Sequence, residues 1–497
     1  MVTGGYVRGG IVEDVIDKVT SRTESSYVWI LAFLGVSLLG LWAYLILQSK
    51  PIIATCLLII LLPFTRRGGD FIYIAAWETS DGYQEKISLT TFMLVLFFFV
   101  LFFRRRRKGL PGKFSSTGFL LLVCMAFGVT GMQFLHHDIF SAFWLSCSSV
   151  WQYVALAYII SGSVESFSDI RKIVWSLCIV ILEAIIIRVA IFHQFFNVGG
   201  IGGAVYGQAD ADYARIGSIA FGGIYYSGYL VTIIYLALYL FRSASSNYTR
   251  LFCAAIIGLF FCDLVGTFTR GAWLGTFFIF LLVFWKRQRM FGLIILGSVA
   301  VTIAVFWPVL EPMVTARLTL SVSDFNDGSA MTRFMLWNDN IIRFVHDPSA
   351  LFFGYGIGLA PLTAGAYEQN TYYSTHNLLL EMTSSCGILA PLLLLCLFGY
   401  AFINLFKLSR VAALKKESEL AVYLFLALLT WFWFANTTSL DVLFYVPFEA
   451  TILFYTIVFI SLRLLDISIK PHVPRAARPH SNGENELIQN SVAHSRP

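Results

Sequence analysis

The chain has little charge for its length. Of its 497 residues only 13% are charged and 58% are hydrophobic, whereas a soluble domain averages about 25% charged residues. This composition excludes a soluble globular protein and predicts a polytopic membrane protein. The net charge of +6 does not indicate nucleic-acid binding, because the basic residues gather in short loops between apolar segments, which is the pattern that orients membrane proteins.

Cysteine motifs are also missing, and no leader segment is expected. The 8 cysteines all lie in apolar segments and none forms a CxxC pair. We expect them to be small buried hydrophobes, which excludes a disulfide framework and a cysteine metal site. A cleavable signal is not expected, because the first apolar run begins near Tyr27 after a mixed-charge segment that lacks a basic start and a small-residue cleavage site.

Long apolar runs fill most of the sequence. We expect membrane spans at about 28–47, 51–64, 88–103, 118–135, 143–161, 173–192, 216–241, 249–267, 272–285, 290–307, 378–406, 419–436 and 446–465. The fold class is therefore predicted to be an all-α polytopic membrane protein with about 12 or 13 transmembrane helices. The runs 51–64 and 272–285 are short for the roughly 20 residues that a crossing needs.

The predicted spans divide the chain into five parts. Residues 1–27 form an N-terminal tail with an amphipathic helix, 28–307 hold about ten spans, 308–377 form one large polar loop, 378–466 hold the C-terminal spans, and 467–497 form a disordered tail. The basic loops place the C-terminal tail in the cytoplasm and the large loop on the opposite face.

The large loop is the longest polar interval. Apolar residues between Phe334 and Val345 recur at helical spacing, which predicts an amphipathic helix on the bilayer surface. Asp347-Pro348 would end this helix, because proline disfavours helix in the residue before it. A glycine-rich turn follows at 354–358, and the loop ends at His376, directly before the next span.

Three arginines lie on the outer side of the predicted bundle. Arg215 opens a span, Arg270 lies in a tight turn between two spans, and Arg333 lies in the large loop. Outward-facing arginines run against the charge rule for loops, so they are candidates for binding a diphosphate through their guanidinium groups. The alternative for each arginine is a contact with a lipid headgroup or a nearby carboxylate.

His376 is a candidate base, since an imidazole titrates near neutral pH and accepts a proton from a hydroxyl. The alternative is an interfacial histidine with a structural role, and Glu381 and Glu368 are alternative bases. Asp263 precedes Arg270 by seven residues, so the two share a face if the helix continues. An acid in a membrane span is normally paired, and we expect Asp263 to orient Arg270 or to face a cavity.

Three further patterns carry less weight. Asp210 and Asp212 have the DxD spacing that binds Mg²⁺ or Mn²⁺ in many sugar transferases, but a solvated acidic loop explains them better. His136-His137-Asp138 contains metal-ligand types, yet adjacent side chains point apart and four donors are not evident. The glycine-rich stretch 199–207 follows an apolar helix rather than a strand, so it is not expected to bind a nucleotide.

Four sequence pieces together point to a family. They are Arg215-Ile216-Gly217, Thr269-Arg270-Gly271, Arg333 to Trp337 followed by Pro348 and the turn 354–358, and His376-Asn377 followed by Leu380 and Gly387. In this order they resemble the O-antigen ligase and polymerase family, that is, WaaL/Wzy-like membrane glycosyltransferases with a Wzy_C-type domain. The resemblance covers about 210–400, and Ala390-Pro391 departs from it where the family has a second glycine.

The resemblance implies a GT-C-like bundle in the bacterial inner membrane. It implies an inverting transfer of a glycan from undecaprenyl diphosphate to an acceptor hydroxyl on the periplasmic face, without a metal or another cofactor. Its partners would be the lipid-linked glycan, an acceptor glycolipid or glycan, and membrane lipids. The implied diphosphate ligands are Arg215, Arg270 and Arg333, the catalytic residues are Arg270 and His376, and the supporting residues are Asp263, Asn377 and Glu381.

Several functions remain open at the sequence level. A ligase would transfer the glycan to lipid A-core, whereas a polymerase would use another lipid-linked repeat unit as the acceptor, and the motifs favour the ligase. A lipid-linked glycan flippase would need ionisable residues near mid-membrane, for which Glu183, Arg188 and Asp263 are few. A membrane scaffold would leave the outer arginines and His376 unexplained.

Overall fold

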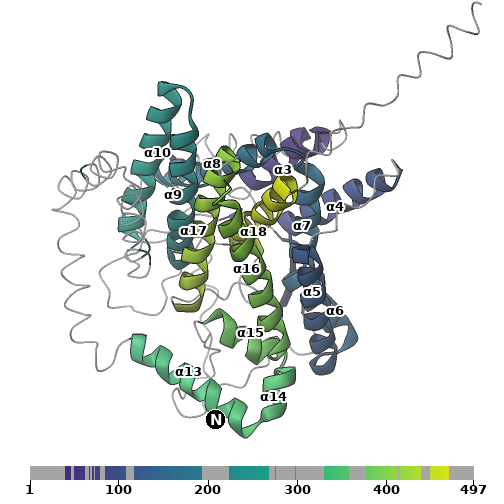
Figure 1. The fold of residues 1–497 in the computed structure, drawn as a ribbon. Helices are drawn as coiled ribbons and strands as arrows, with labels where there is room; N and C mark the ends of the chain where they lie inside the picture. Colours follow the sequence, from purple (N-terminus) through teal and green to yellow (C-terminus); the bar gives the residue numbers. More distant parts are fainter. Residues whose placement is uncertain are drawn as a thin grey trace, which may run out of the picture.

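The computed structural model describes residues 40–45, 50–61, 66–67, 70–71, 73–78, 84–107, 117–192, 223–267, 272, 275, 297, 329–357, 377–411, 414–437 and 448–469. Its helices are shown in Figure 1. They are α3 (Pro51–Ile60), α4 (Leu89–Arg107), α5 (Thr117–His136), α6 (Ile139–Ser146), α7 (Gln152–Ser163), α8 (Phe167–Phe192), α9 (Gly223–Ser243), α10 (Asn247–Gly266), α13 (Ser329–His346), α14 (Pro348–Phe353), α15 (Leu378–Cys386), α16 (Leu389–Leu408), α17 (Lys415–Thr437) and α18 (Phe448–Ile469).

The helices confirm an all-α polytopic membrane protein. Within the described ranges, four helical segments are long and apolar enough to cross a membrane, namely Thr117–His136, Asn247–Leu264, Leu389–Leu408 and Lys416–Asn436. These segments belong to α5, α10, α16 and α17. The spans predicted at 272–285 and 290–307 lie almost entirely outside the described residues.

Two short hairpins lie between α3 and α4, in an interval that hydropathy predicts to be a loop. Strand β1 (Arg66–Arg67) pairs antiparallel with β2 (Asp70–Phe71). Strand β3 (Tyr73–Glu78) pairs antiparallel with β4 (Gln84–Ser88), with an irregularity between Tyr73 and Ala75. Each hairpin pairs the backbone groups of its own two strands, so the helical class of the bundle is unaffected.

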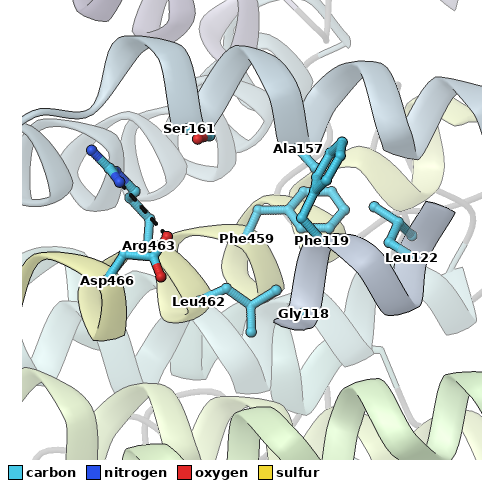
Figure 2. A pocket seen from close by; sticks show the side chains of 9 residues that line it. All are labelled: Gly118, Phe119, Leu122, Ala157, Ser161, Phe459, Leu462, Arg463 and Asp466. Atoms are coloured by element: carbon cyan, nitrogen blue, oxygen red, sulfur yellow. Dashed lines mark ion pairs between the residues drawn. The ribbon is translucent and has the colours of Figure 1, made fainter. Parts of the chain in front are cut away.

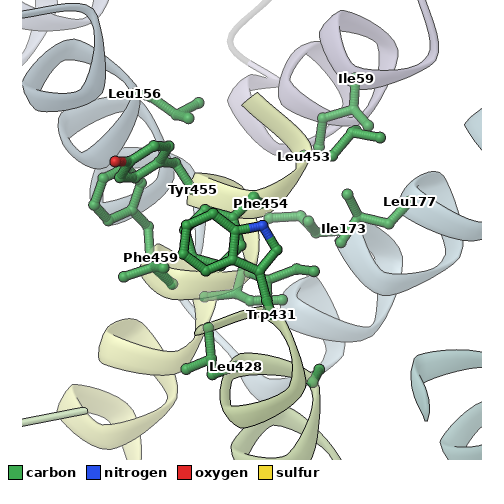
Figure 3. Packing of buried hydrophobic residues seen from close by; sticks show 14 of the residues in the cluster. Ile59, Leu156, Ile173, Leu177, Leu428, Trp431, Leu453, Phe454, Tyr455 and Phe459 are labelled. Atoms are coloured by element: carbon green, nitrogen blue, oxygen red, sulfur yellow. The ribbon is translucent and has the colours of Figure 1, made fainter. Parts of the chain in front are cut away.

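The core of the bundle is aromatic. The rings of Trp431 and Phe454 are stacked, as are those of Tyr153 and Tyr455, whose centroids lie 3.8 Å apart. Figure 3 shows Trp431, from α17, surrounded by side chains of α18 and neighbouring helices. Because lipid is as apolar as these side chains, close packing rather than removal from water stabilises this core.

Two sequence predictions about helix boundaries have different outcomes. The amphipathic helix is confirmed: α13 ends at His346, and the Asp347 side chain caps α14 by accepting from the backbone N–H groups of Ser349 and Ala350. The single span predicted at 378–406 is wrong, because α15 and α16 are separate helices that meet at Gly387. Gly387 has a φ of 71°, a left-handed conformation that interrupts a helix and that glycine adopts without strain.

The cysteines are all free, as expected, but they are not all buried. Cys178, Cys253 and Cys386 are buried, whereas Cys124 and Cys396 are exposed on the sides of α5 and α16. Cys56, Cys147 and Cys262 are half-buried. The prediction of burial therefore holds fully for three of the eight, because a span facing lipid accommodates a small apolar side chain on its outer surface as readily as inside.

Candidate functional site

The structure describes part of the predicted site. Asp263, Asn377 and Glu381 are described with their side chains, and Arg333 is described only as a backbone position in the first turns of α13. The remaining predicted residues lie outside the described residues: Arg215, Arg270, His376, Asp210 and Asp212. The geometry of the site is therefore built from the elements that flank these positions.

Asp263 is buried near the end of α10. It is 4% exposed, and its Oδ2 accepts a hydrogen bond of 2.5 Å from the hydroxyl of Tyr226, a fully buried residue of α9. A carboxyl group inside a membrane protein requires such a partner. Helix α10 ends at Gly266 and Thr267 lies in a turn, so the helix does not continue as a shared face of Asp263 and Arg270 would require, and Arg270 itself lies outside the described residues.

Asn377 caps α15 directly after His376 in the sequence. Its backbone is extended, and its Oδ1 accepts from the backbone N–H groups of Leu379 and Leu380, each at 3.1 Å. This is the arrangement in which asparagine satisfies the free N–H groups at a helix start. The Nδ2 of Asn377 donates to the backbone oxygen of Asn436 in α17 at 3.2 Å.

Glu381 lies in the first turn of α15, four residues after Asn377. It is 2% exposed. A carboxylate in the first turn of a helix is favoured by the partial positive charge of the free N–H groups. The spacing of four residues places Glu381 on the same face of the helix as Asn377, next to the segment that carries His376 in the sequence.

The glycine-rich turn joins α14 to the end of α15. Gly354 and Gly387 both have a φ of 71°. A Cβ atom on Gly387 would lie 2.0 Å from the backbone oxygen of Phe352, and a Cβ atom on Gly354 would lie 2.7 Å from the backbone nitrogen of Cys386. The backbone N–H of Tyr355 also donates to the oxygen of Ser384 at 2.7 Å. We call this contact the glycine junction, and only glycine fits at its two closest points.

The C-terminal end of α5 holds the glycine junction from the other side. Gln133 is fully buried, and its Oε1 accepts from the backbone N–H of Ile357 at 2.9 Å while its Nε2 contacts the sulfur of Cys386 at 3.5 Å. The Nε2 atoms of His136 and His137 contact the backbone oxygens of Phe353, at 3.3 Å, and Ile357, at 3.1 Å. A carbonyl oxygen only accepts, so each ring donates a proton from Nε2.

This role of α5 was not predicted from the sequence, in which His136-His137-Asp138 suggests only a poor metal site. In the structure Asp138 caps α6 through the backbone N–H groups of Phe140 and Ser141. The available signal was the spacing of Gln133, His136 and His137, which puts three polar side chains on one face of an apolar helix at its C-terminal end.

Helix α13 is tied to the same junction. The hydroxyl of Ser384 in α15 donates to Oδ1 of Asn340 in α13 at 2.8 Å. Burial raises the pKa of the Tyr355 hydroxyl; the nearby Asp347 carboxylate raises it further and Arg343 opposes this, so Tyr355 stays neutral at physiological pH. The helix that contains Arg333 and the helix that follows His376 in sequence are thus parts of one hydrogen-bonded assembly.

A small pocket lies at the opposite end of α5, near Gly118 (Figure 2). Arg463 of α18 is at its polar end, where its Nε donates to the backbone oxygen of Val164 at 2.8 Å and its guanidinium pairs with Asp466 at 3.7 Å. Val164 ends α7, so Arg463 donates a hydrogen bond to a carbonyl that has no partner within that helix. These contacts give the arginine a structural role, away from the glycine junction.

Comparison with known proteins identifies the central part of the chain. Residues 253–396 match the family model described as O-antigen ligase, which is less than half of the chain. A search of curated proteins finds no match. The matched range contains Asp263, the glycine junction and the start of α15, whereas Gln133 and Asn436 lie outside it. Residues 253–396 of this polytopic helical membrane protein are therefore similar to the O-antigen ligase family.

Proposed function

We propose that this protein is a glycosyltransferase of the bacterial inner membrane that transfers a glycan from undecaprenyl diphosphate to a hydroxyl of lipid A-core on the periplasmic face. The observation that carries the proposal is the match of residues 253–396 to the O-antigen ligase family. The matched range includes Arg270, Arg333 and His376, which the sequence analysis selected as site residues.

In the proposed reaction the diphosphate is the leaving group. Negative charge grows on it as the anomeric bond breaks, and Arg215, Arg270 and Arg333 stabilise that charge as preorganised cations. Their positions in the chain support this role, since Arg215 precedes α9, Arg270 follows α10, and the buried Tyr226–Asp263 hydrogen bond joins these two helices. The arginines make a metal ion unnecessary, so transfer is expected to persist in EDTA.

His376 accepts the proton of the acceptor hydroxyl as the oxygen attacks the anomeric carbon. A single in-line attack inverts the configuration at that carbon. Asn377 supports His376 because it caps the helix that begins directly after it, and Glu381 supports it as a buried carboxyl group in the first turn of the same helix.

The test is the lipopolysaccharide ladder and the undecaprenyl-linked glycan pool in a deletion strain that expresses single variants. His376→Ala and Arg270→Ala, at wild-type protein levels, are expected to give rough lipopolysaccharide with long polymer stranded on undecaprenyl diphosphate. His346→Ala, which removes an exposed histidine at the end of α13, is the matched control and keeps the ladder. Core plus a single repeat unit would identify a polymerase instead, and a normal ladder in both variants would refute the site.

A further inference from the structure

We propose that Asn436, in the last turn of α17, is a positioning residue that fixes the start of α15, and with it His376, for the transfer reaction. This inference rests on the proposed function. Asn436 lies outside the range that matches the O-antigen ligase family.

Asn436 contacts the first turn of α15 in two ways. Its backbone oxygen accepts from Nδ2 of Asn377 at 3.2 Å, and its Oδ1 accepts from the backbone N–H of Leu379 at 3.4 Å. Its own Nδ2 donates to the backbone oxygen of Phe432, one turn earlier in α17, at 2.8 Å. The Asn436 side chain is therefore oriented by α17 and directed at the start of α15.

These contacts determine the conformation of Asn377. Its amide is held at both ends, because Oδ1 caps α15 and Nδ2 is bound to α17. Its backbone is fixed in the extended region, with φ −141° and ψ 114°. The direction of the chain before α15 depends on this conformation. The Asn436 side chain supports it through the backbone N–H of Leu379, which donates both to Oδ1 of Asn377 and to Oδ1 of Asn436.

Helix α17 is a rigid support for this contact. Trp431, five residues before Asn436, is stacked on Phe454 of α18, and both rings lie 6.0 Å from that of Phe398 in α16. Tyr235 of α9 accepts from the Thr430 hydroxyl at 3.2 Å. The packed core therefore holds the last turn of α17 in place. A misplacement of about 1 Å at a reacting group reduces the rate about 100-fold, so a rigid support matters for catalysis.

Three variants separate positioning from general stability. Asn436→Ala removes the Oδ1 that accepts from Leu379. Asn436→Asp keeps that oxygen, and its negative charge at the start of α15 is favourable. Asn404→Ala is the matched control. Asn404 lies in α16 at the other end of the bundle, and its Nδ2 makes the same kind of bond, to the backbone oxygen of Tyr400 one turn earlier, at 2.7 Å.

The experiment uses the full chain in lipid nanodiscs, with undecaprenyl-diphosphate-linked glycan extracted from a deletion strain as the donor and lipid A-core as the varied acceptor. Asn436→Ala is expected to lower kcat by roughly 10- to 100-fold with little change in KM. Asn436→Asp is expected to restore most of kcat, Asn404→Ala to match wild type, and the unfolding temperatures of the three variants to agree.

Two results would overturn the positioning role. One is wild-type kcat in Asn436→Ala; the other is an equal loss in Asn436→Ala and Asn436→Asp that follows their unfolding temperatures. His376→Ala in the same assay tells the two failures apart. If it is inactive while Asn436→Ala is fully active, only the positioning role fails. If wild type transfers no glycan, or if His376→Ala is fully active, the proposed function or its site fails.

Discussion

The glycine junction and the aromatic core of the bundle are stabilised in different ways. In the junction, backbone atoms of α14 and α15 approach so closely that Gly354 and Gly387 leave no room for a Cβ atom. In the core, Trp431 and Phe454 pack ring against ring. The junction depends on direction and exact fit, whereas the core depends on filled volume, which tolerates exchange between apolar residues of similar size.

The core and the glycine junction also differ in whether their polar contacts stay within one helix or join two helices. Among the described residues, some polar contacts of the core stay within single helices, as when Thr232 donates to the oxygen of Gly228 and Ser461 to that of Ile457, although Tyr226 also binds Asp263 across two helices. Those of the junction join separate helices, as when Gln133 binds Ile357 and Ser384 binds Asn340. The same residue type should therefore be sensitive to substitution in one region and tolerant in the other.

The largest effect is expected at the closest backbone contact. In Gly387→Ala the backbone conformation alone, with φ 71° and ψ 172°, costs about 1 to 3 kcal/mol, and the new Cβ would lie 2.0 Å from the oxygen of Phe352, so α14 and α15 must separate. We expect the unfolding temperature to fall by several degrees and glycan transfer to be lost.

The matched control for this substitution is Gly399→Ala in α16. A Cβ atom on Gly399 would have no neighbour within 4 Å, and alanine is favoured over glycine inside a helix by about 1 kcal/mol. Its unfolding temperature should stay unchanged or rise. Equal behaviour of the two alanine variants in thermal unfolding would mean that the close contact at Gly387 is not required.

An intermediate effect is expected at Gln133. Gln133→Leu leaves the backbone N–H of Ile357, a buried residue, without its acceptor, and an unsatisfied buried donor costs about 1 to 3 kcal/mol. Thr232→Val is the control, since Thr232 is equally buried but donates only to oxygens of its own helix. Urea unfolding in detergent should show a loss for Gln133→Leu alone, and equal losses would contradict the distinction between the regions.

Hydropathy was sufficient to predict the bundle and α13. The apolar runs and the helical spacing between Phe334 and Val345 are properties of neighbouring residues, so a window along the chain detects them. The break at Gly387 was missed because one glycine barely changes the hydropathy of a leucine-rich run. The end of α10 at Gly266 lies within one residue of the end of the span predicted at 249–267, because the apolar run stops there.

The assembly around the site was less predictable for a different reason. Gln133 and His137 bind backbone atoms of Ile357, more than 200 positions later in the chain. A backbone N–H or C=O group is nearly the same for every residue type. The residues around Gln133 and His137, and those around Ile357, therefore give no sign of which groups will pair. Motifs select Arg270, Arg333 and His376 as candidates, but only the fold shows that α5 contacts residues 353–357 and that α17 contacts the start of α15.

The smallest and most discriminating effect is expected at Ser384. Ser384→Ala removes the hydrogen bond to Asn340 that joins α15 to α13, whereas Ser461→Ala removes a hydrogen bond within α18. We expect Ser384→Ala to lose about 0.5 to 1.5 kcal/mol of unfolding free energy and Ser461→Ala to lose almost none. Chemical unfolding of the two variants and wild type in one detergent measures the difference.

Glycan transfer by the same two variants sharpens the comparison further. Helix α13 contains Arg333, so a loosened link to α15 should weaken transfer by Ser384→Ala more than its small loss of stability explains, because misplaced groups lower the rate steeply. A loss of transfer in Ser461→Ala as large as in Ser384→Ala would show instead that the bundle and the junction respond as one body. The contrast between directed contacts and filled volume would then not extend to function.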